Sequence, residues 1–284
     1  MYDMHQSGAI AFGDGTNPIQ SAGIVLKALQ YVKSFNGTVI QIPEDKSIGA
    51  NGLMNEGIIS TQLGLPGKPA IAEEILIARD IKLARYAESK LHFTGVSSAK
   101  SIEYIKRAKE SGINISCSVT PYHLLFIDAS MQDYDSNLKV NPPLRIETDR
   151  QALLAAVTDG TVDCIASHHF PQNWDGKTCE FEYAKNGMTG LQTVFAVVNH
   201  LLPELSLNRL TALFSLNARA IFGLPVIHIT EGAVADLSLF TKSGQTLLSK
   251  EQLKSKSANS PFLDRELTGK VIGTINKDKV FLNS

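Results

Sequence analysis

The sequence has little of what marks secreted, membrane-spanning or nucleic-acid-binding proteins. It contains only 3 cysteines in 284 residues, Cys117, Cys164 and Cys179, and no CxxC pair. The first two lie in apolar, strand-like runs, where a buried free thiol is expected. Lys and Arg (27) nearly balance Asp and Glu (28), giving a net charge of −1. Such a balance creates no field that attracts nucleic acid or an anionic membrane, so neither partner is expected.

Long apolar runs are missing as well. No stretch approaches the roughly 20 apolar residues that a membrane-spanning helix needs. The first residues, MYDMHQSGAIAF, have neither the basic region nor the long apolar region of a secretion signal. These absences and the free thiols predict a cytoplasmic globular protein. Its 43% of apolar residues can supply a core for one large α/β domain or two smaller ones.

Short β-rich runs alternate with helical patterns over the first part of the chain. Strands are predicted at 8–12, 38–42, 91–96, 113–121 and 162–167, and helices at 20–35, 70–88, 101–112 and 148–160. This alternation predicts five β/α units with parallel strands. Residues 189–222 continue in a helical pattern with a break near Pro203. Short strands at 235–240, 270–275 and 280–282 then predict a β subdomain over residues 226–284, after an α/β part over residues 1–225.

Candidate functional residues follow the predicted strands, because ligands bind at the carboxyl ends of parallel strands in such folds. These positions are Asp14 and residues 42–45, 95–98, 120–123 and 168–172. In the stretch CIASHHFPQ (164–172) an apolar run ends in two adjacent histidines. Neighbouring residues on a strand face opposite sides, so this doublet does not form a chelating pair by geometry.

A series of motifs runs through the chain in one order. They are MNEG, LGLPGKPAIAEE, ARDIKLAR, LHFTGVSSAKS, SVTPYHLL, KVNPPLR, DGTVDCIASHHFP and GAVADLSLF. With these motifs the chain resembles the dihydroorotases of the metal-dependent amidohydrolase superfamily, from about Gly8 to about Phe281. The resemblance implies a (β/α)8 TIM barrel, of which about strands 4 to 8 are expected here, with part of a C-terminal β-sandwich subdomain. It also implies zinc-dependent interconversion of dihydroorotate and carbamoyl aspartate in pyrimidine biosynthesis.

The same resemblance implies that most metal ligands are replaced. Asp14 matches a family ligand and is the residual one. Ile42 and Gly95 stand where the family has ligating histidines, and the HxH pair of the first barrel strand has no counterpart before Asp14. His168 stands at the aspartate that contacts metal and acts as the general base. Zinc catalysis needs fixed ligands and one open position. We therefore expect zinc to be absent or weakly bound.

The substrate side of the family site has matches at three positions and a replacement at a fourth. The resemblance implies contacts with the pyrimidine ring at Asn141, Asn186 and Gly187, and Gln172 replaces a histidine that contacts substrate in the family. A dihydroorotate-like ligand could use them. Equally, Pro142 and its neighbouring proline fix the backbone beside Asn141 without any ligand.

Two further histidines need a separate interpretation. His123 matches a family histidine near the substrate loop, although a lone loop histidine is more often solvated. His92 lies three residues before Gly95, so on an extended strand it is expected to point to the opposite face.

Three functions remain open from the sequence. The first is a catalytically silent family member acting as a structural or regulatory subunit, by self-association or with aspartate carbamoyltransferase, in which His168 closes the barrel mouth. The second is an active zinc-dependent cyclic amidohydrolase with a rearranged site built from Asp14, His168 and His169. The third is a small-molecule sensor. A barrel without its first strands has two unpaired sheet edges, so self-association or poor behaviour of the isolated chain is expected.

Overall fold

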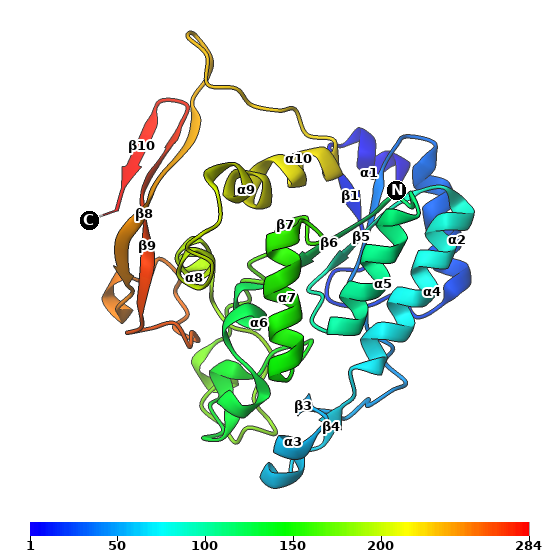
Figure 1. Cartoon of the computed structure of the whole chain (residues 1–284), viewed down its shortest axis with the longest axis vertical. Coiled ribbons are helices and arrows are strands. Elements are labelled where there is room, and N and C mark those ends of the chain that lie inside the picture. Colours follow the sequence, from blue (N-terminus) through cyan, green and yellow to red (C-terminus); the bar gives the residue numbers. More distant parts are fainter. Residues whose placement is uncertain (284) are drawn as a thin grey trace.

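A computed structural model describes residues 1–283. The main sheet has five parallel strands in the order β1-β2-β5-β6-β7 (Figure 1). These strands are β1 (Ala11–Phe12), β2 (Thr38–Gln41), β5 (Lys90–Thr94), β6 (Ile115–Val119) and β7 (Cys164–Ile165). Apart from an inserted pair of two-residue strands, the order follows the chain, as in a (β/α)8 barrel. The predicted α/β class and the five β/α units are confirmed.

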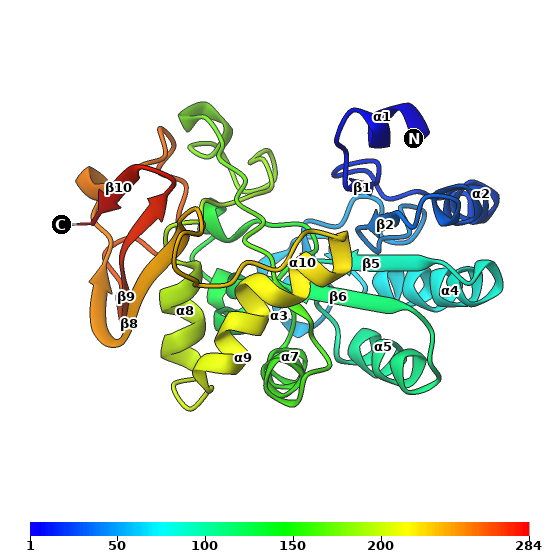
Figure 2. The same cartoon turned by 90° about the horizontal axis from the view of Figure 1, so that it is seen from above.

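Four helices connect these strands and pack on one face of the sheet (Figure 2). They are α2 (Ala22–Lys33), α4 (Ile71–Ala87), α5 (Ala99–Glu110) and α7 (Glu147–Asp159). On α2 the buried residues Val25, Leu29 and Val32 recur at helical spacing and so form one apolar stripe. The side chain of Ser98 accepts a hydrogen bond from the backbone N–H of Ser101 and begins α5.

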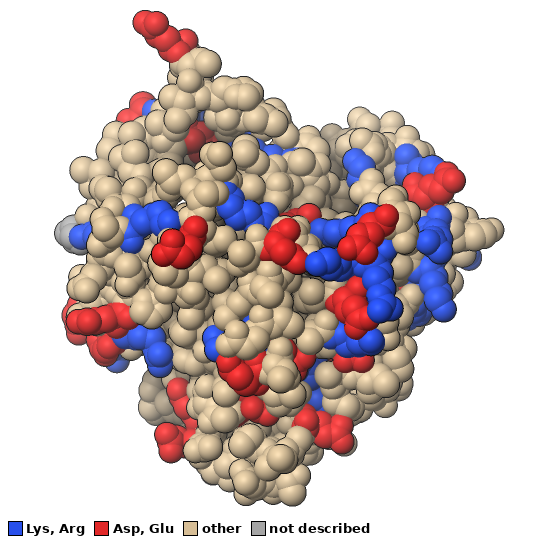
Figure 3. Space-filling view, viewed as in Figure 1, with Lys and Arg blue, Asp and Glu red and all other residues tan. Residues whose placement is uncertain are grey.

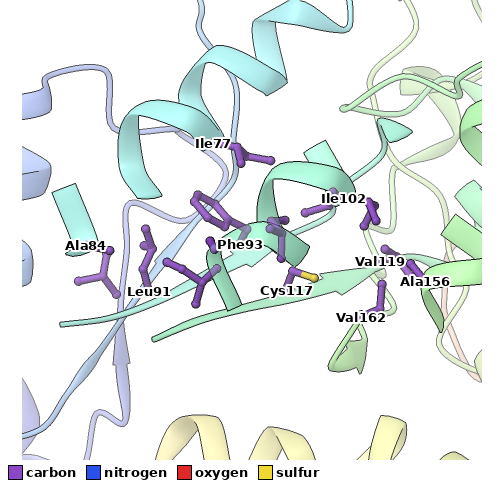
Figure 4. Close-up of a cluster of buried hydrophobic side chains, with 14 of the residues drawn as sticks. Ile77, Ala84, Leu91, Phe93, Ile102, Cys117, Val119, Ala156 and Val162 are labelled. Atoms are coloured by element: carbon purple, nitrogen blue, oxygen red, sulfur yellow. The ribbon is translucent and has the colours of Figure 1, made fainter. Parts of the chain in front are cut away.

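The apolar core lies between these helices and the sheet (Figure 4). On β5, Leu91 and Phe93 belong to this core. Alternation along the strand therefore sends His92 and Thr94 to the other face of the sheet. The inner face of β5 is thus polar, whereas its outer face is fully apolar.

The amino-terminal ends of the sheet strands are covered by the last helical segment. This segment consists of α8 (Val194–Leu201), α9 (Leu207–Thr211), a π-helical turn (Ala212–Leu216) and α10 (Asn217–Phe222). The backbone carbonyl of Ile221 accepts a hydrogen bond from Thr38, at the start of β2. Asn217 donates to the carbonyl of Asp163, just before β7. Because α10 occupies the amino-terminal ends of the strands, the carboxyl ends remain for the site.

A three-stranded antiparallel sheet follows, in the order β10-β9-β8 (Figure 1). It consists of β8 (Asp236–Leu247), β9 (Glu266–Asn276) and β10 (Lys279–Leu282). The first two strands are longer than predicted, because β8 continues beyond a register irregularity and still pairs with the first residues of β9. Asn199 of α8 donates to the carbonyls of Lys242 and Thr268, 3.0 and 2.8 Å away, and attaches this sheet to the helices.

Short elements complete the chain. They are α1 (Tyr2–Gln6), β3 (Met54–Asn55), α3 (Ile58–Leu63), β4 (Gly67–Lys68), α6 (Pro121–Leu125) and 3-10 turns at Asp128–Met131, Ser136–Leu138, Trp174–Gly176 and Lys250–Gln252. No helix within residues 1–283 is both long and apolar enough to cross a membrane. Basic and acidic side chains are interspersed over α4 and α5 on the face shown in Figure 3, as the balanced composition predicts.

Candidate active site

His168 follows β7 and lies against the end of β5. Its Nε2 is 2.8 Å from Oγ1 of Thr94. A Cβ atom placed on Gly95 would lie 2.5 Å from Cε1 of His168, a separation that real Cβ atoms do not show. The imidazole therefore fills the space that a side chain at position 95 would need, so the residues at these two positions are sterically coupled. His168 itself has a φ of +38°, in a region that non-glycine residues seldom adopt.

A chain of hydrogen bonds leads from His168 across the inner face of the sheet. Thr94 Oγ1 accepts from Ser118 Oγ at 3.0 Å. Ser118 Oγ also lies 3.2 Å from Nε2 of His92, whose Nδ1 is 2.8 Å from Ser116 Oγ. The expectation that His92 points away from the site is wrong. It shares the inner face with Thr94, two residues on, while the backbone turns at Gly95.

Both imidazoles in this chain are neutral at pH 7. Burial lowers the pKa of His92 to about 3, and the charge of Lys109, with that of His168 once it is protonated in acid, acts in the same direction. Burial alone lowers the pKa of His168 to about 4. The result is a neutral network of imidazoles and hydroxyls at the centre of the strand ends.

His169 has different partners from His168. Its Nδ1 accepts hydrogen bonds from the backbone N–H groups of Gly190 and Leu191, each at 3.3 Å, and its backbone forms an isolated parallel bridge with Met188. The two adjacent histidines therefore serve separate contacts, and the doublet does not act as a chelating pair.

A second polar cluster joins three loops beside the site. The Lys68 ammonium forms an ion pair with Glu44, and both side chains are 12% exposed. Lys68 also donates to Oδ1 of Asn141 at 2.8 Å, and Asn141 Nδ2 donates to Oε2 of Glu44 at 2.6 Å. Burial raises the pKa of Glu44, but the hydrogen bonds from Lys68 and Asn141 outweigh it and hold the pKa below its usual value. Asn141 is thus fully engaged by protein groups.

A third cluster explains several of the motifs as architecture. Arg145, from KVNPPLR, donates to Ser97 Oγ and to Asn55 Oδ1, each at 3.0 Å. It also lies 3.7 Å from a carboxylate oxygen of Glu73. Glu73 in turn accepts from the backbone N–H of Ser97 at 3.0 Å. Arg145 and Glu73 are both buried, so this cluster connects the loops internally rather than presenting them to a ligand.

His123 is buried, and the expectation of a solvated loop histidine is wrong. Its Nδ1 lies 2.8 Å from Thr120 Oγ1, and its Nε2 is 3.2 Å from the carbonyl oxygens of both Pro142 and Pro143. Burial lowers the pKa of His123 to about 3, with a smaller effect of the Arg145 charge. The histidine therefore fixes the proline loop that carries Asn141.

The remaining predicted site residues lie in two places. Asp14 is exposed in the turn after β1, where its carbonyl accepts from the N–H of Asn17. Gln172 Nε2 donates to the carbonyl of Asn186 at 2.8 Å, and Gly187 follows with a φ of +119°. The structure thus brings Gln172 to the Asn186-Gly187 turn but leaves Asn141 in the Glu44 cluster.

A zinc ion of the kind that the resemblance implies does not fit the donors at these strand ends. Ile42 and Gly95 offer no side-chain donor, and Nε2 of His168 is engaged by Thr94. Over residues 1–283 there is no group of three or more His, Cys, Asp or Glu side chains that could hold a metal ion. Tetrahedral zinc needs at least three protein ligands in a catalytic site.

Sequence reasoning placed Glu44 among the candidate positions 42–45 but gave it no role, and it missed Lys68. Glu44 is signalled only by its place two residues beyond Ile42, after β2. Lys68 has no local signal, because it reaches Glu44 from β4, 24 residues further along the chain.

Comparison with solved structures defines the fold. The L-hydantoinase (dihydropyrimidinase) from Arthrobacter aurescens matches with a TM-score of 0.85 at 23% identity, covering 99% of this chain and 66% of that one. The D-hydantoinase from Bacillus sp. AR9 matches with a TM-score of 0.82 at 22% identity, with the same two coverages. The chain has the fold of the corresponding part of these hydantoinases.

Comparison of sequences defines the family. A family model described as "Dihydro-orotase-like" matches residues 1–101. The dihydroorotase of Pelotomaculum thermopropionicum is 38% identical over 285 residues, which cover 99% of this chain and 67% of that protein. The dihydroorotase of Caldanaerobacter subterraneus is 39% identical over 283 residues, which cover 99% of this chain and 65% of that protein. The chain belongs to the dihydroorotase family and spans about two thirds of the length of these relatives.

Proposed function

We propose that the chain is a catalytically silent member of the dihydroorotase family, linked to pyrimidine biosynthesis. The observation that carries this proposal is the placement of His168 against Gly95. In this proposal Gly95 lacks the ligand side chain that the family resemblance implies for its position, and the imidazole of His168 fills the space in front of it and hydrogen-bonds with Thr94.

The chemistry of His168 supports the same conclusion. A general base works best when its pKa lies near the operating pH. The burial that lowers the pKa of His168 to about 4 makes it a weak proton acceptor at pH 7. Without a metal-activated water and without an effective base, hydrolysis of a cyclic amide has no nucleophile at this site.

The proposed role is that of a structural or regulatory subunit. Within each of the three polar clusters around the strand ends the side chains hydrogen-bond to one another, which supports a scaffold rather than an open catalytic cleft. The partner in this proposal is aspartate carbamoyltransferase or a second copy of the chain.

Metal content and activity test the proposal together. The purified chain would be dialysed against zinc, analysed for bound metal, and assayed for dihydroorotate hydrolysis and carbamoyl aspartate cyclisation. The dihydroorotase of Pelotomaculum thermopropionicum serves as the active control. We expect far less than one zinc per chain and no turnover above background.

The alternative, an active zinc-dependent cyclic amidohydrolase with a rearranged site, is favoured by one feature. The carboxylate of Asp14 belongs to an exposed residue at the end of β1 and is available to a ligand. Near-stoichiometric zinc, removed by a chelator together with dihydroorotate hydrolysis, would establish this alternative and overturn the silent function. Substitution Asp14→Asn should then abolish both zinc binding and turnover.

Partner binding is tested separately. The chain would be mixed with an aspartate carbamoyltransferase catalytic subunit and analysed by size-exclusion chromatography with light scattering. A joint peak supports the subunit role. If the two proteins eluted separately and the chain were a monomer, the subunit role would be contradicted.

A further inference from the structure

A pocket of about 780 Å³ lies outside the strand-end site, between the loop after β7 and the segment that joins β8 to β9. Its walls consist of residues 136–137, 171–174, 177–178, 250 and 255–259. Three of the lining residues are lysines, Lys177, Lys250 and Lys256, whereas no Asp or Glu of the described chain lines it. Gln172, a predicted substrate-side residue, is among the lining residues, whereas His168 and the members of the Glu44 cluster are not.

Lys177 is the buried cation of this pocket, with 7% of its surface exposed. Its Nζ donates to the carbonyl oxygens of Ser136 at 2.7 Å and Lys139 at 3.4 Å. An ammonium has three donors, so one remains for a ligand. Burial, with a smaller effect of the neighbouring Lys139 charge, lowers the pKa of Lys177 to about 8. The side chain is therefore mostly protonated at pH 7.

The three lysines have no carboxylate partners within the described residues: no Asp or Glu oxygen of residues 1–283 lies within 4.0 Å of Lys177, Lys250 or Lys256. Lys250 and Lys256 are exposed, so water screens their charges, but with Lys177 they give the pocket a lining whose charged side chains are all basic. The arrangement is that of an anion site.

Trp174 gives the pocket an aromatic wall. It is the single tryptophan of the chain, lines the pocket and is 76% exposed. An indole offers a large, rigid face on which a flat ring can stack. Another part of the wall is fixed by Asn259, whose side chain accepts from the backbone N–H of Gln172 at 3.1 Å and donates to the carbonyl of Gly187 at 3.1 Å.

We propose that this pocket binds a phosphorylated small molecule with an aromatic or heterocyclic ring, the chemical class of the nucleotides. The phosphate lies among Lys177, Lys250 and Lys256, and the ring stacks on Trp174. Lysine is a common phosphate ligand because its ammonium is a compact point charge with rotatable donors. The joint presence of three such cations and one exposed indole distinguishes this class from inorganic anions.

The lone tryptophan makes the test direct, because all indole fluorescence arises inside the pocket. The complete chain would be titrated with uridine 5′-monophosphate and, in parallel, with inorganic phosphate, while Trp174 emission is recorded. We expect saturable quenching by the nucleotide and at least about tenfold weaker binding of phosphate, which corresponds to the loss of one stacking contact.

Variants separate the pocket from general surface charge. Lys256→Gln and Lys250→Gln, both at exposed side chains, should each weaken nucleotide binding by about tenfold, and Lys177→Met should weaken it further. Lys254→Gln is the matched control, because Lys254 is exposed in the same segment but is not among the pocket-lining residues. Circular dichroism confirms that each variant is folded, and the two exposed variants test the proposal even if Lys177→Met does not fold.

Three results would overturn the proposal. The first is the absence of saturable quenching by the nucleotide. The second is an equal effect of Lys254→Gln and Lys256→Gln, which would indicate non-specific charge. The third is binding of phosphate, or of an acidic peptide, as tight as that of the nucleotide, which would reassign the pocket to inorganic anions or to a protein partner.

Discussion

At position 95 two independent constraints act on one residue. The backbone φ of +75° disfavours any residue with a Cβ, and the His168 imidazole occupies the space in front of it. A glycine there is therefore required by the present site. Reintroducing a ligating histidine at this position would demand that His168 move first.

Gly95→Ala should therefore lower the free energy of unfolding by about 2–4 kcal/mol, from backbone strain and overpacking together. Gly112→Ala is the matched control, because Gly112 has a φ of +72° but a Cβ added there would meet no neighbouring atom within 4 Å. Gly112→Ala should lower the free energy of unfolding only by the backbone strain, about 1 kcal/mol. Urea unfolding measures both. Adding His168→Ala to Gly95→Ala should recover part of the difference, and equal costs at the two glycines would contradict the coupling.

The buried histidines predict a loss of stability in acid. His92 and His123 have a folded-state pKa of about 3, below the usual 6.5. The unfolded chain takes up protons below pH 6.5 that the folded chain does not, so this stability is present above pH 6.5 and falls towards pH 3. Below pH 6.5 each buried imidazole lowers the free energy of unfolding by about 1 kcal/mol per pH unit.

Urea midpoints at several pH values between 7.5 and 5 measure this slope. His92→Gln should make it shallower than in the wild-type chain. His228→Gln, at an exposed histidine, should leave it unchanged. A wild-type slope in the His92→Gln variant would show that His92 protonates freely.

Single residues were the least predictable scale. The substitutions at Ile42, Gly95 and His168 are visible in the sequence, but their consequence is not. The contact of His168 with Thr94 spans 74 residues, and that of His123 with Pro142 spans 19 residues. Burial of these imidazoles depends on such long-range packing, which no local pattern encodes. The spacing of His92 and Gly95 indicated the wrong face of the sheet for His92 for a different reason: the strand alternation ends where Gly95 turns the backbone.

Elements were predicted well where apolar residues recur at the period of the element. The helix predicted at 70–88 is α4 (Ile71–Ala87), and the strand predicted at 91–96 is β5 (Lys90–Thr94). Both have apolar residues at the period of their element, because one face meets the core. The second half of β8 was missed, since residues 241–247 are mostly polar and are placed only by pairing with β9. The division at residue 225 remains a prediction.

Lys68 connects the small β3-β4 pair with the loop after β2, and it predicts an effect at the element scale. Lys68→Met should lower the free energy of unfolding by about 3 kcal/mol, because Glu44 would stay buried without its cation. The double variant Lys68→Met with Glu44→Gln should recover part of this loss. Chemical denaturation of the single and double variants gives the coupling energy.

Lys33→Met is the control for this pair. The Lys33 and Glu88 side chains form an ion pair at 2.9 Å but are 50% and 80% exposed, so water screens them and little change is expected. If Lys33→Met lowered the free energy of unfolding as much as Lys68→Met, burial would not determine how much these ion pairs stabilise the fold.

At the scale of the whole molecule, the sheet edges govern how chains meet. β10 is an edge strand of the antiparallel sheet, and its three apolar residues are all strongly exposed, Val280 by 58%, Phe281 by 60% and Leu282 by 67%. Natural edge strands usually carry charges or are covered. An apolar, uncovered edge offers both backbone hydrogen bonds and side-chain burial to a second copy.

The chain should therefore self-associate in a concentration-dependent way, as size-exclusion chromatography with light scattering would reveal. Phe281→Lys should shift the equilibrium towards the monomer, because a charge at the contact must be desolvated on association. Ile58→Lys is the control: Ile58 is 76% exposed but lies on α3, outside the antiparallel sheet that contains β10. If both variants reduce association equally, general surface hydrophobicity rather than the β10 edge drives it. A sharp monomer peak with cooperative unfolding in the wild-type chain would contradict the prediction altogether, and it would imply that exposed edges in this fold are tolerated without a partner.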